Sequence, residues 1–503
     1  MTARLVVLCV DGADDDLLVE LAETGRMPAL GQLVGRGTTV TMETPGDIFD
    51  LGVWPMLVTG QPPGNHALAH FLEFEAPTMG VHVRRETELE PFWLHLPERG
   101  GGVVALDVPE IHPTADWEAE GTCCWHGYAP PHPALITSKR LRRALSPLGP
   151  PPELTSPRRP ASAAEEDQVA AMLGRAVAFQ ARAALLAGGG SHTLCIGFQQ
   201  HHAVVHWLGH HYLADHWHRP GPMRPELALS TYDALDAALG RIIGAHEDAN
   251  IAVVVARGGR PANHAPALLD GLLERAGLQV RRAGDGITSA ATRKPLALRL
   301  LQRIPEERRS QLASHLPPFL LNPLLARQFR AQFAWDRTSV FNLPAWDAGL
   351  IRLNVVGREA FGILPPADYE PTIEEVTKLV RETVNADTGL PLAADVVRLR
   401  RAFPGTNDEV WPDLAVVWAG DRPAHRARHP HLGMWEAESV GSLWTEHRSP
   451  ALAILAGPSV PARSERIDGD PLGLAPTLLA LSGIRRPSVM PASAWSDLLD
   501  ARG

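Results

Sequence analysis

The sequence has few of the features that set special classes of protein apart. Among its 503 residues there are only four cysteines, Cys9, Cys123, Cys124 and Cys195. Two of these are adjacent in the chain, which is a poor basis for a disulfide framework, so we expect reduced structural thiols. Internal repeats, heptads and low-complexity tracts are also missing, which argues against a solenoid or a coiled coil.

Long apolar runs and an excess of positive charge are lacking as well. No apolar run approaches the roughly 18 residues of a membrane span, and the opening segment MTARLVVLCVDG has no hydrophobic stretch long enough for export. The formal net charge is −10, which argues against a general nucleic-acid or anionic-membrane surface. We therefore expect a cytoplasmic protein without membrane or nucleic-acid partners, and the oligomeric state is left open.

Short apolar runs alternate with helical patterns along the chain. Six runs are expected to be buried parallel strands: Arg4–Val10, Gly102–Asp107, His192–Phe198, Ile251–Ala256, Asp413–Trp418 and Ala451–Ala456. Four stretches have helical periodicity: Asp15–Arg36, Ala163–Ala187, Glu226–His246 and Ile373–Val384. This alternation predicts an α/β fold whose sheet is covered on both faces. We expect one domain over 1–503, with a basic helical insertion or cap at about 293–337.

Histidine is the residue that the chain has in excess. Eight of its 22 histidines lie between His192 and His218, at and beyond the expected strand His192–Phe198. Imidazole is the commonest metal ligand near neutral pH, and open α/β sheets bind ligands at the carboxyl ends of their strands. The segment therefore predicts a metal site, and the alternative is a solvated His-rich helix face.

Asp11 ends the first expected strand and is followed by Gly12. A carboxylate in this position is a good metal ligand, and it is equally often a helix N-cap that accepts backbone N–H groups. Both roles stay open from the local sequence.

Eight motifs, in order along nearly the whole chain, resemble the type I phosphodiesterase/nucleotide pyrophosphatase family of the alkaline phosphatase superfamily. They are VDGAD, WPMLVTGQPPGNHA, LDVPEIHP, TYDALDAALGRII, GLIRLNVVGREAFGIL, WPDLAVVWAG, TEHRSPALAILAGPSV and DPLGLAPTLLALSGI. The resemblance implies a three-layer α/β/α sandwich with a central, mostly parallel sheet. It also implies hydrolysis of phosphate esters by two metal ions, usually zinc, and a Thr or Ser nucleophile.

The resemblance keeps one of the two metal sites, with altered ligands. The family's first site takes an Asp, a His four residues later and a distant His near the C-terminus, and the matching positions here are His202, His206 and His447. The spacing of four places the first two rings on one side of a helical turn. Three His with an open position resemble the ligands of a catalytic zinc that activates water, and iron or manganese are the other candidates.

The second site is remodelled. Asp11 remains as a ligand implied by the resemblance, but the SDHG motif after IAVVV reads Ala256–Gly259, with Arg257 in place of a carboxylate. Arg257 either pairs with Asp11 in place of the metal or binds an anionic substrate in a bidentate manner. The nucleophile position falls on Asp50, or on Asp47 if the register differs by three, and Asp50 is a metal ligand, a general base or a nucleophile.

The sequence therefore predicts a metal-dependent hydrolase of a phosphate or related oxyanion ester. It would have one principal metal, expected to be zinc, with Arg257 in place of the second metal, and a small anionic substrate. Two alternatives stay open. One is a catalytically silent protein that binds an anion or a partner, in which Arg257 and Asp11 form only a structural salt bridge. The other is a mononuclear metal enzyme with non-hydrolytic chemistry.

Overall fold

The structure of the chain is a computed structural model. It describes residues 4–499, with gaps at 50, 84–88, 97–101, 114–120, 125–134, 153–159, 214–215, 218–220, 283–317, 408–409, 421 and 438–444. Asp50 thus lies outside the described residues.

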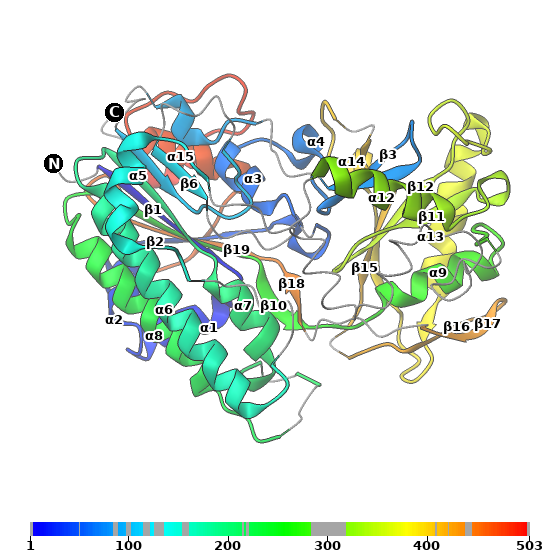
Figure 1. Ribbon diagram of the computed structural model, residues 1–503, viewed down its shortest axis with the longest axis horizontal. Coiled ribbons are helices and arrows are strands. Elements are labelled where there is room, and N and C mark those ends of the chain that lie inside the picture. Colours follow the sequence, from blue (N-terminus) through cyan, green and yellow to red (C-terminus); the bar gives the residue numbers. More distant parts are fainter. Residues whose placement is uncertain are drawn as a thin grey trace.

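The described chain forms two lobes, and the first is built on a nine-stranded sheet (Figure 1). In spatial order its strands are β20 (Ile467–Asp468), β2 (Gly37–Met42), β19 (Ala451–Ala456), β9 (Asn250–Ala256), β1 (Leu5–Asp11), β8 (Thr193–Phe198), β5 (Val103–Leu106), β6 (Gly121–Cys124) and β7 (Leu135–Ile136). Five of the eight neighbouring pairs described are parallel. The predicted mostly parallel central sheet is confirmed.

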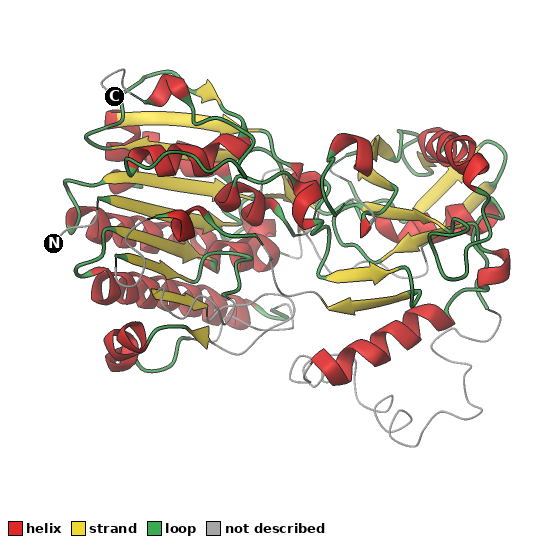
Figure 2. Cartoon of the chain, turned by 90° about the horizontal axis from the view of Figure 1, so that it is seen from above, coloured by secondary structure: helices red, strands yellow, loops and turns green. Residues whose placement is uncertain are grey.

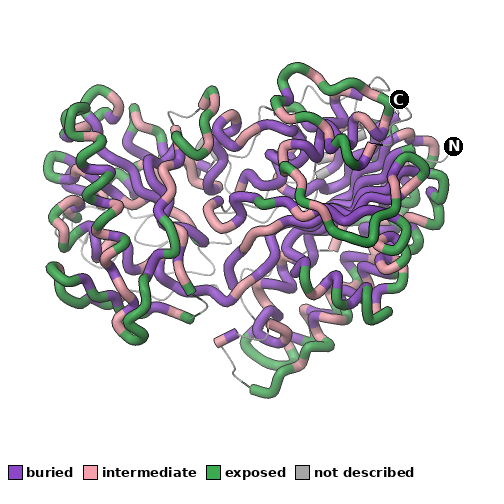
Figure 3. The backbone as a smooth tube through the Cα atoms, turned by 180° about the vertical axis from the view of Figure 1, so that it is seen from behind, coloured by how far each residue is buried: buried purple, intermediate pink, exposed green. Residues whose placement is uncertain are grey.

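Helices cover both faces of this sheet, as the side chains of β1 show. Val6 and Leu8 belong to one hydrophobic core, and the alternate residues Val7 and Cys9 belong to another. The first core is closed by α1 (Asp15–Glu23), α2 (Pro28–Arg36), α6 (Ala163–Gly188), α7 (Gln200–Leu208) and α8 (Glu226–Gly244). The second is closed by α3 (Val53–Thr59) and α15 (Leu474–Leu481). Figure 3 shows the strands between them as a block of buried chain.

Two expected strands differ from the prediction of parallel pairing. β19 lies between β9 and β2 and runs antiparallel to both. The run expected at Asp413–Trp418 forms β15 (Leu414–Trp418), which pairs antiparallel with its neighbours in a separate sheet. A continuous apolar run indicates that a strand is buried on both faces, but it does not indicate the direction of the strand. The sequence therefore could not distinguish parallel from antiparallel pairing for these two runs.

The helical pattern Asp15–Arg36 is also divided. α1 ends at Glu23, Gly25 takes a left-handed backbone with φ of +80°, and α2 begins at Pro28. Glycine accepts this conformation without steric cost, and proline is favoured at the first position of a helix, so the turn separates two helices.

The second lobe has its own antiparallel sheet (Figure 2). Its strands are β11 (Val340–Leu343), β12 (Gly349–Leu353), β15 and β14 (Ala393–Arg398), with α9 (Pro266–Arg275), α12 (Pro318–Ala331) and α13 (Tyr369–Glu382) packed around it. Leu350 and Ile351 of β12 point to opposite cores. Of the cap predicted at about 293–337, the structure describes only the part from residue 318 on, which contains α12, since 283–317 lie outside the described residues.

The sequence predicts no membrane span. By length and hydropathy alone, α6 is the one helix in the described part of the chain that would suffice, but 50% of its apolar window is buried inside the structure. Leu173 and Val177 of α6 lie in the first core, against the sheet and α8. A helix packed in this way is typical of a protein core.

Candidate metal centre

The centre lies where three neighbouring parallel strands end. β9, β1 and β8 are adjacent, and Asp11 at the end of β1 is paired with Ala256 of β9. Because parallel strands end at the same edge of a sheet, Asp11, Arg257 after β9 and α7 after β8 come together. A two-stranded ribbon of β10 (Gly258–Pro261) and β18 (Thr445–Arg448) places His447 opposite Gly259 (Figure 1).

The structure brings the three predicted histidines together. One ring nitrogen from each of His202, His206 and His447 lies within 4.8 Å of the others. The Nε2 atoms of His206 and His447 are 3.3 Å apart. Two nitrogens that each bind a tetrahedral zinc at its usual bond length stand about 3.3 Å from one another, so the spacing fits one ion.

Each of the three rings has an oxygen atom facing its Nδ1. The Nδ1 of His202 is 3.0 Å from Asp11 Oδ2, that of His206 is 3.2 Å from the Thr445 carbonyl, and that of His447 is 3.0 Å from the Arg257 carbonyl. Carbonyl and carboxylate oxygens only accept, so each Nδ1 carries the proton in a neutral ring. The Nε2 atoms are left with lone pairs.

Burial favours the neutral form of these three imidazoles. Burial lowers the pKa of His202, although the carboxylate of Asp11 opposes this, and lowers the pKa of His206 and His447 well below the usual value. Two lone pairs that face one another at 3.3 Å repel, and a cation between them removes the repulsion. Protein oxygens on Nδ1 and open Nε2 atoms are the usual arrangement of metal-binding histidines. The donor set therefore fits a divalent metal.

Asp11, predicted as a metal ligand, contacts His202 and Trp54 in the structure. Its two oxygens accept hydrogen bonds from His202 Nδ1 and from the Trp54 indole, at 3.0 and 2.7 Å. Burial raises the pKa of Asp11, but the guanidinium of Arg257, together with His202 and Trp54, outweighs burial and the net pKa is lowered. Asp11 thus holds the ring of His202 from behind, and the role of direct ligand is not what the described contacts favour.

Arg257 is buried, and its ion pair in the described structure is with Glu110 rather than with Asp11. Glu110 accepts from Arg257 Nη1 through Oε1 and from the Gly52 N–H through Oε2, the second at 2.7 Å. Burial raises the pKa of Glu110 to about 7, although Arg257 opposes this shift. Glu110 therefore ties the guanidinium to the chain that leads into α3.

Glu110 was missed at the level of sequence. It lies in the motif LDVPEIHP, just beyond β5, whose carboxyl end is next to that of β8. A carboxylate just after a buried parallel strand was the available signal, and it is the same signal that pointed to Asp11.

A second group of metal-binding side chains consists of Glu166, His210 and His211, named here the Glu166 cluster. Its proton arrangement differs from that of the three histidines. The Nδ1 of His211 accepts from the Arg224 N–H at 3.2 Å, so a neutral His211 carries its proton on Nε2, which is 3.2 Å from Glu166. The ring directs a proton, not a lone pair, at the carboxylate. Glu166 also lies 3.3 Å from His210 and 3.4 Å from Arg224, so ionic contacts hold the Glu166 cluster together.

Solved structures share this architecture. A phosphonoacetate hydrolase from Sinorhizobium meliloti 1021, in complex with phosphonoacetate, aligns with a TM-score of 0.51 and 14% identity over 96% of this chain and 95% of that chain. The fold is alkaline-phosphatase-like. The same hydrolase with phosphonoformate gives a TM-score of 0.50 at 14% identity, covering 96% and 95% of the two chains.

Murine ectonucleotide pyrophosphatase/phosphodiesterase 5, as an inactive variant in complex with AMP, aligns with a TM-score of 0.49 and 12% identity over 99% of this chain and 100% of that chain. No protein-family model matches the sequence, and no curated protein matches it. At 14% identity the likeness to the phosphonoacetate hydrolase shows the fold, and function depends on the site.

Proposed function

We propose that the protein is a metal-dependent hydrolase of phosphate or related oxyanion esters, with one principal metal held by His202, His206 and His447. The convergence of three imidazoles whose Nδ1 atoms all face oxygens is the observation that carries the proposal. A bound divalent ion, with zinc as the first candidate, would supply Lewis acidity toward an oxyanion and toward water.

Arg257 supports a single-metal arrangement. It stands where the resembled family has a metal-binding carboxylate, and a permanent cation there disfavours a second metal ion. Its charge lowers the pKa of the adjacent Asp11, so the two groups interact electrostatically. We propose that this guanidinium binds an oxyanion of the substrate, since planar N–H donors match such oxygens.

Asp11 and Glu110 are proposed to position these groups. Asp11 fixes the orientation of the His202 ring, and Glu110 fixes the guanidinium of Arg257. Asp50 remains a proposal for the group that accepts a proton from water, because it occupies the nucleophile position of the resembled family and a carboxylate serves as a general base. A small anionic substrate follows from the cationic groups.

The experiment that tests the proposal combines elemental analysis with an activity screen. Purified protein is expected to retain about one equivalent of a divalent metal and to hydrolyse at least one member of a panel of phosphate monoesters, diesters and sulfate esters. Phosphonoacetate is added because a hydrolase of similar fold acts on it. His206→Ala should lose both the metal and the activity.

His211→Ala is the matched control. It removes a buried imidazole from the Glu166 cluster and should leave metal content unchanged, since its proton arrangement does not suit a metal. Metal-free protein that folds normally would refute the proposal and favour a silent anion-binding protein. Bound metal without hydrolysis of any ester would favour non-hydrolytic chemistry.

A further inference from the structure

Trp54, in the first turn of α3, supports the metal centre from behind. Its indole N–H donates to Asp11 Oδ1 at 2.7 Å, and Asp11 Oδ2 accepts from the His202 ring at 3.0 Å. Trp54 and Asp11 are both buried, with 0% and 1% of their surfaces exposed, so bulk water does not replace the indole. A buried carboxylate oxygen without a donor is costly. Loss of the indole N–H should therefore let the carboxylate turn, and the ring of His202 would lose its fixed acceptor.

Gly52, two residues earlier, supports the guanidinium in the same manner. Its backbone N–H donates to Glu110 Oε2 at 2.7 Å, and Glu110 Oε1 accepts from Arg257. Gly52 has a left-handed backbone with φ of +103°, and a Cβ there would lie 2.4 Å from the carbonyl oxygen of Leu68. Glycine alone therefore fits this place without displacing the chain. The turn Gly52–Trp54 thus holds both carboxylates, each by one N–H group.

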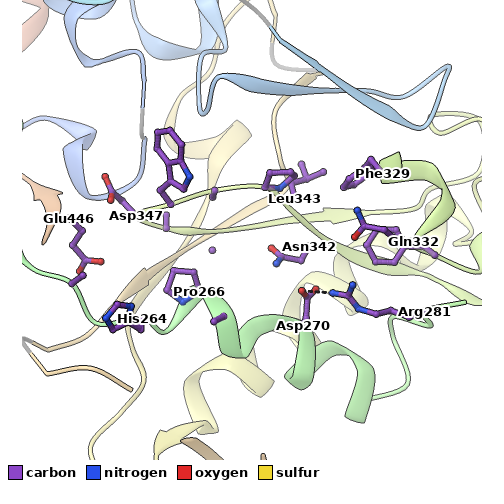
Figure 4. A pocket seen from close by; sticks show the side chains of 18 residues that line it. His264, Pro266, Asp270, Arg281, Phe329, Gln332, Asn342, Leu343, Asp347 and Glu446 are labelled. Atoms are coloured by element: carbon purple, nitrogen blue, oxygen red, sulfur yellow. Dashed lines mark hydrogen bonds and ion pairs between the residues drawn. The ribbon is translucent and has the colours of Figure 1, made fainter. Parts of the chain in front are cut away.

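The other two rings rest on the ribbon of β10 and β18. The Nδ1 of His206 faces the carbonyl of Thr445, and that of His447 faces the carbonyl of Arg257, the residue before β10. The opposite face of the ribbon turns to the second lobe, where Glu446 lines a cavity of about 330 Å³ (Figure 4). Among the described contacts, α3 therefore supports one of the three rings and the ribbon supports the other two.

We propose that the turn Gly52–Trp54 is a positioning element that keeps the His202 ring and the guanidinium in fixed places relative to each other. One N–H holds the carboxylate behind the ring, and a second N–H holds the carboxylate behind the guanidinium. Fixed geometry between a metal ligand and an oxyanion-binding group is what catalysis requires. The inference rests on the proposed metal site and makes Trp54 a positioning residue that acts through Asp11.

Trp54→Phe and Trp93→Phe form a matched pair that tests the proposal. Both tryptophans are fully buried in the second core, but the indole N–H of Trp93 has no hydrogen-bond partner among the described residues. Metal-free protein is titrated with zinc against a competing chelator. We expect Trp54→Phe to bind zinc at least threefold more weakly than the wild type, because the carboxylate that orients a ligand loses its own partner. Trp93→Phe should stay within twofold of the wild type.

Cobalt in place of zinc gives a readout that packing alone does not change. The visible absorption of bound cobalt depends on the arrangement of its ligands, so a turned His202 ring should shift the bands in Trp54→Phe. Trp93→Phe should give the bands of the wild type.

Gly52→Ala tests the turn as a whole, and Gly60→Ala, at the other end of α3, is its control. Both glycines have positive φ, but the nearest neighbours of a Cβ at Gly60 would stand 3.3 Å away. Gly52→Ala should weaken zinc binding at least tenfold. It should also weaken the binding of inorganic phosphate to zinc-loaded protein at least fivefold, measured by calorimetry. Gly60→Ala should lower the stability of the fold and change either affinity less than threefold.

Equal zinc affinity in the wild type and in folded Trp54→Phe, or an unshifted cobalt spectrum, would overturn the inference and leave the proposed function standing. Equal losses in Trp54→Phe and Trp93→Phe would also overturn it. A folded wild type that binds neither zinc nor cobalt would instead refute the proposed function, and the inference with it. If Trp54→Phe does not fold, the glycine pair decides the matter, and unchanged affinities in Gly52→Ala would overturn the inference.

Discussion

Replacing Asp11 by Asn separates a group that positions a ligand from one that binds metal directly. Asp11 uses one oxygen for the Trp54 indole and the other for the Nδ1 of His202, at 2.7 and 3.0 Å. Asn has a single oxygen, so its NH₂ group must face one of these two N–H donors. The His202 ring then turns, or moves its proton to Nε2 and loses the lone pair that a metal needs.

Changes to groups that orient metal-binding histidines cost about 10- to 100-fold in metal affinity. This corresponds to about 1.4 to 2.7 kcal/mol of binding free energy. We expect Asp11→Asn to weaken zinc binding within this range while still binding one equivalent. The assay is a titration of metal-free protein with zinc in the presence of a competing chelator.

Asp236→Asn is the matched control for this experiment. Asp236 is buried and accepts from the N–H groups of Ala29 and Leu30 at 3.2 and 2.9 Å, so the variant loses similar hydrogen bonds away from the three histidines. It should lower the stability of the fold without changing zinc affinity. The reasoning is refuted if Asp11→Asn binds zinc within twofold of the wild type. Complete loss of zinc would instead show that Asp11 is a direct ligand.

Three further predictions concern the packing beside the metal centre and the stability of the fold. Gly12→Ala should weaken zinc binding at least tenfold in the same titration, because a Cβ there would lie 2.4 Å from the Cα of His202 and Gly12 has φ of +79°; unchanged affinity would show that α7 adjusts freely. Leu8→Ala should lower the free energy of unfolding in urea by about 2 to 5 kcal/mol, since Leu8 is fully buried in the first core; a loss below 1 kcal/mol would contradict this packing. Burial raises the pKa of Asp413, but Arg358 outweighs the effect of burial and the net pKa is lowered. The ionised carboxylate therefore stabilises the fold above its unfolded pKa of about 3.9, and this contribution is lost as the pH falls through the lower pKa of the folded state. Urea unfolding between pH 6 and 3 should therefore show a smaller loss of stability in Asp413→Asn than in the wild type, and parallel curves would refute the assignment.

The parts of the fold that the sequence predicts are those set by local pattern. β1, β8 and β9 are short apolar runs, and their place in the sheet follows from βαβ alternation. The antiparallel direction of β19 could not be predicted. All six of its residues are apolar, and such a run indicates burial on both faces of a sheet without indicating the direction of the strand. The second lobe was missed for a related reason. Its strands are short and pair antiparallel with one another, so their runs resemble those of the central sheet.

The candidate site shows the same limit. His202 and His206 are linked by helical spacing, and His447 was found only through the resemblance of the whole motif order. Glu110 is 147 residues from Arg257 in the chain, and no local pattern indicates which charged group will meet it. The proton positions on the rings depend on backbone carbonyls of Thr445 and Arg257, which no sequence pattern reveals.

The four residues of β18 carry two kinds of chemistry on one short strand. The imidazole of His447 points to one side and the carboxylate of Glu446 to the other. The register of the pairing with β10 determines the side that each of them faces. Sliding this strand by a single residue would turn Glu446 toward the imidazoles of α7 and His447 toward the side that Glu446 now faces. Insertions or deletions next to Thr445–Arg448 should thus disable the metal centre, whereas equal changes in surface loops of the second lobe would leave it intact.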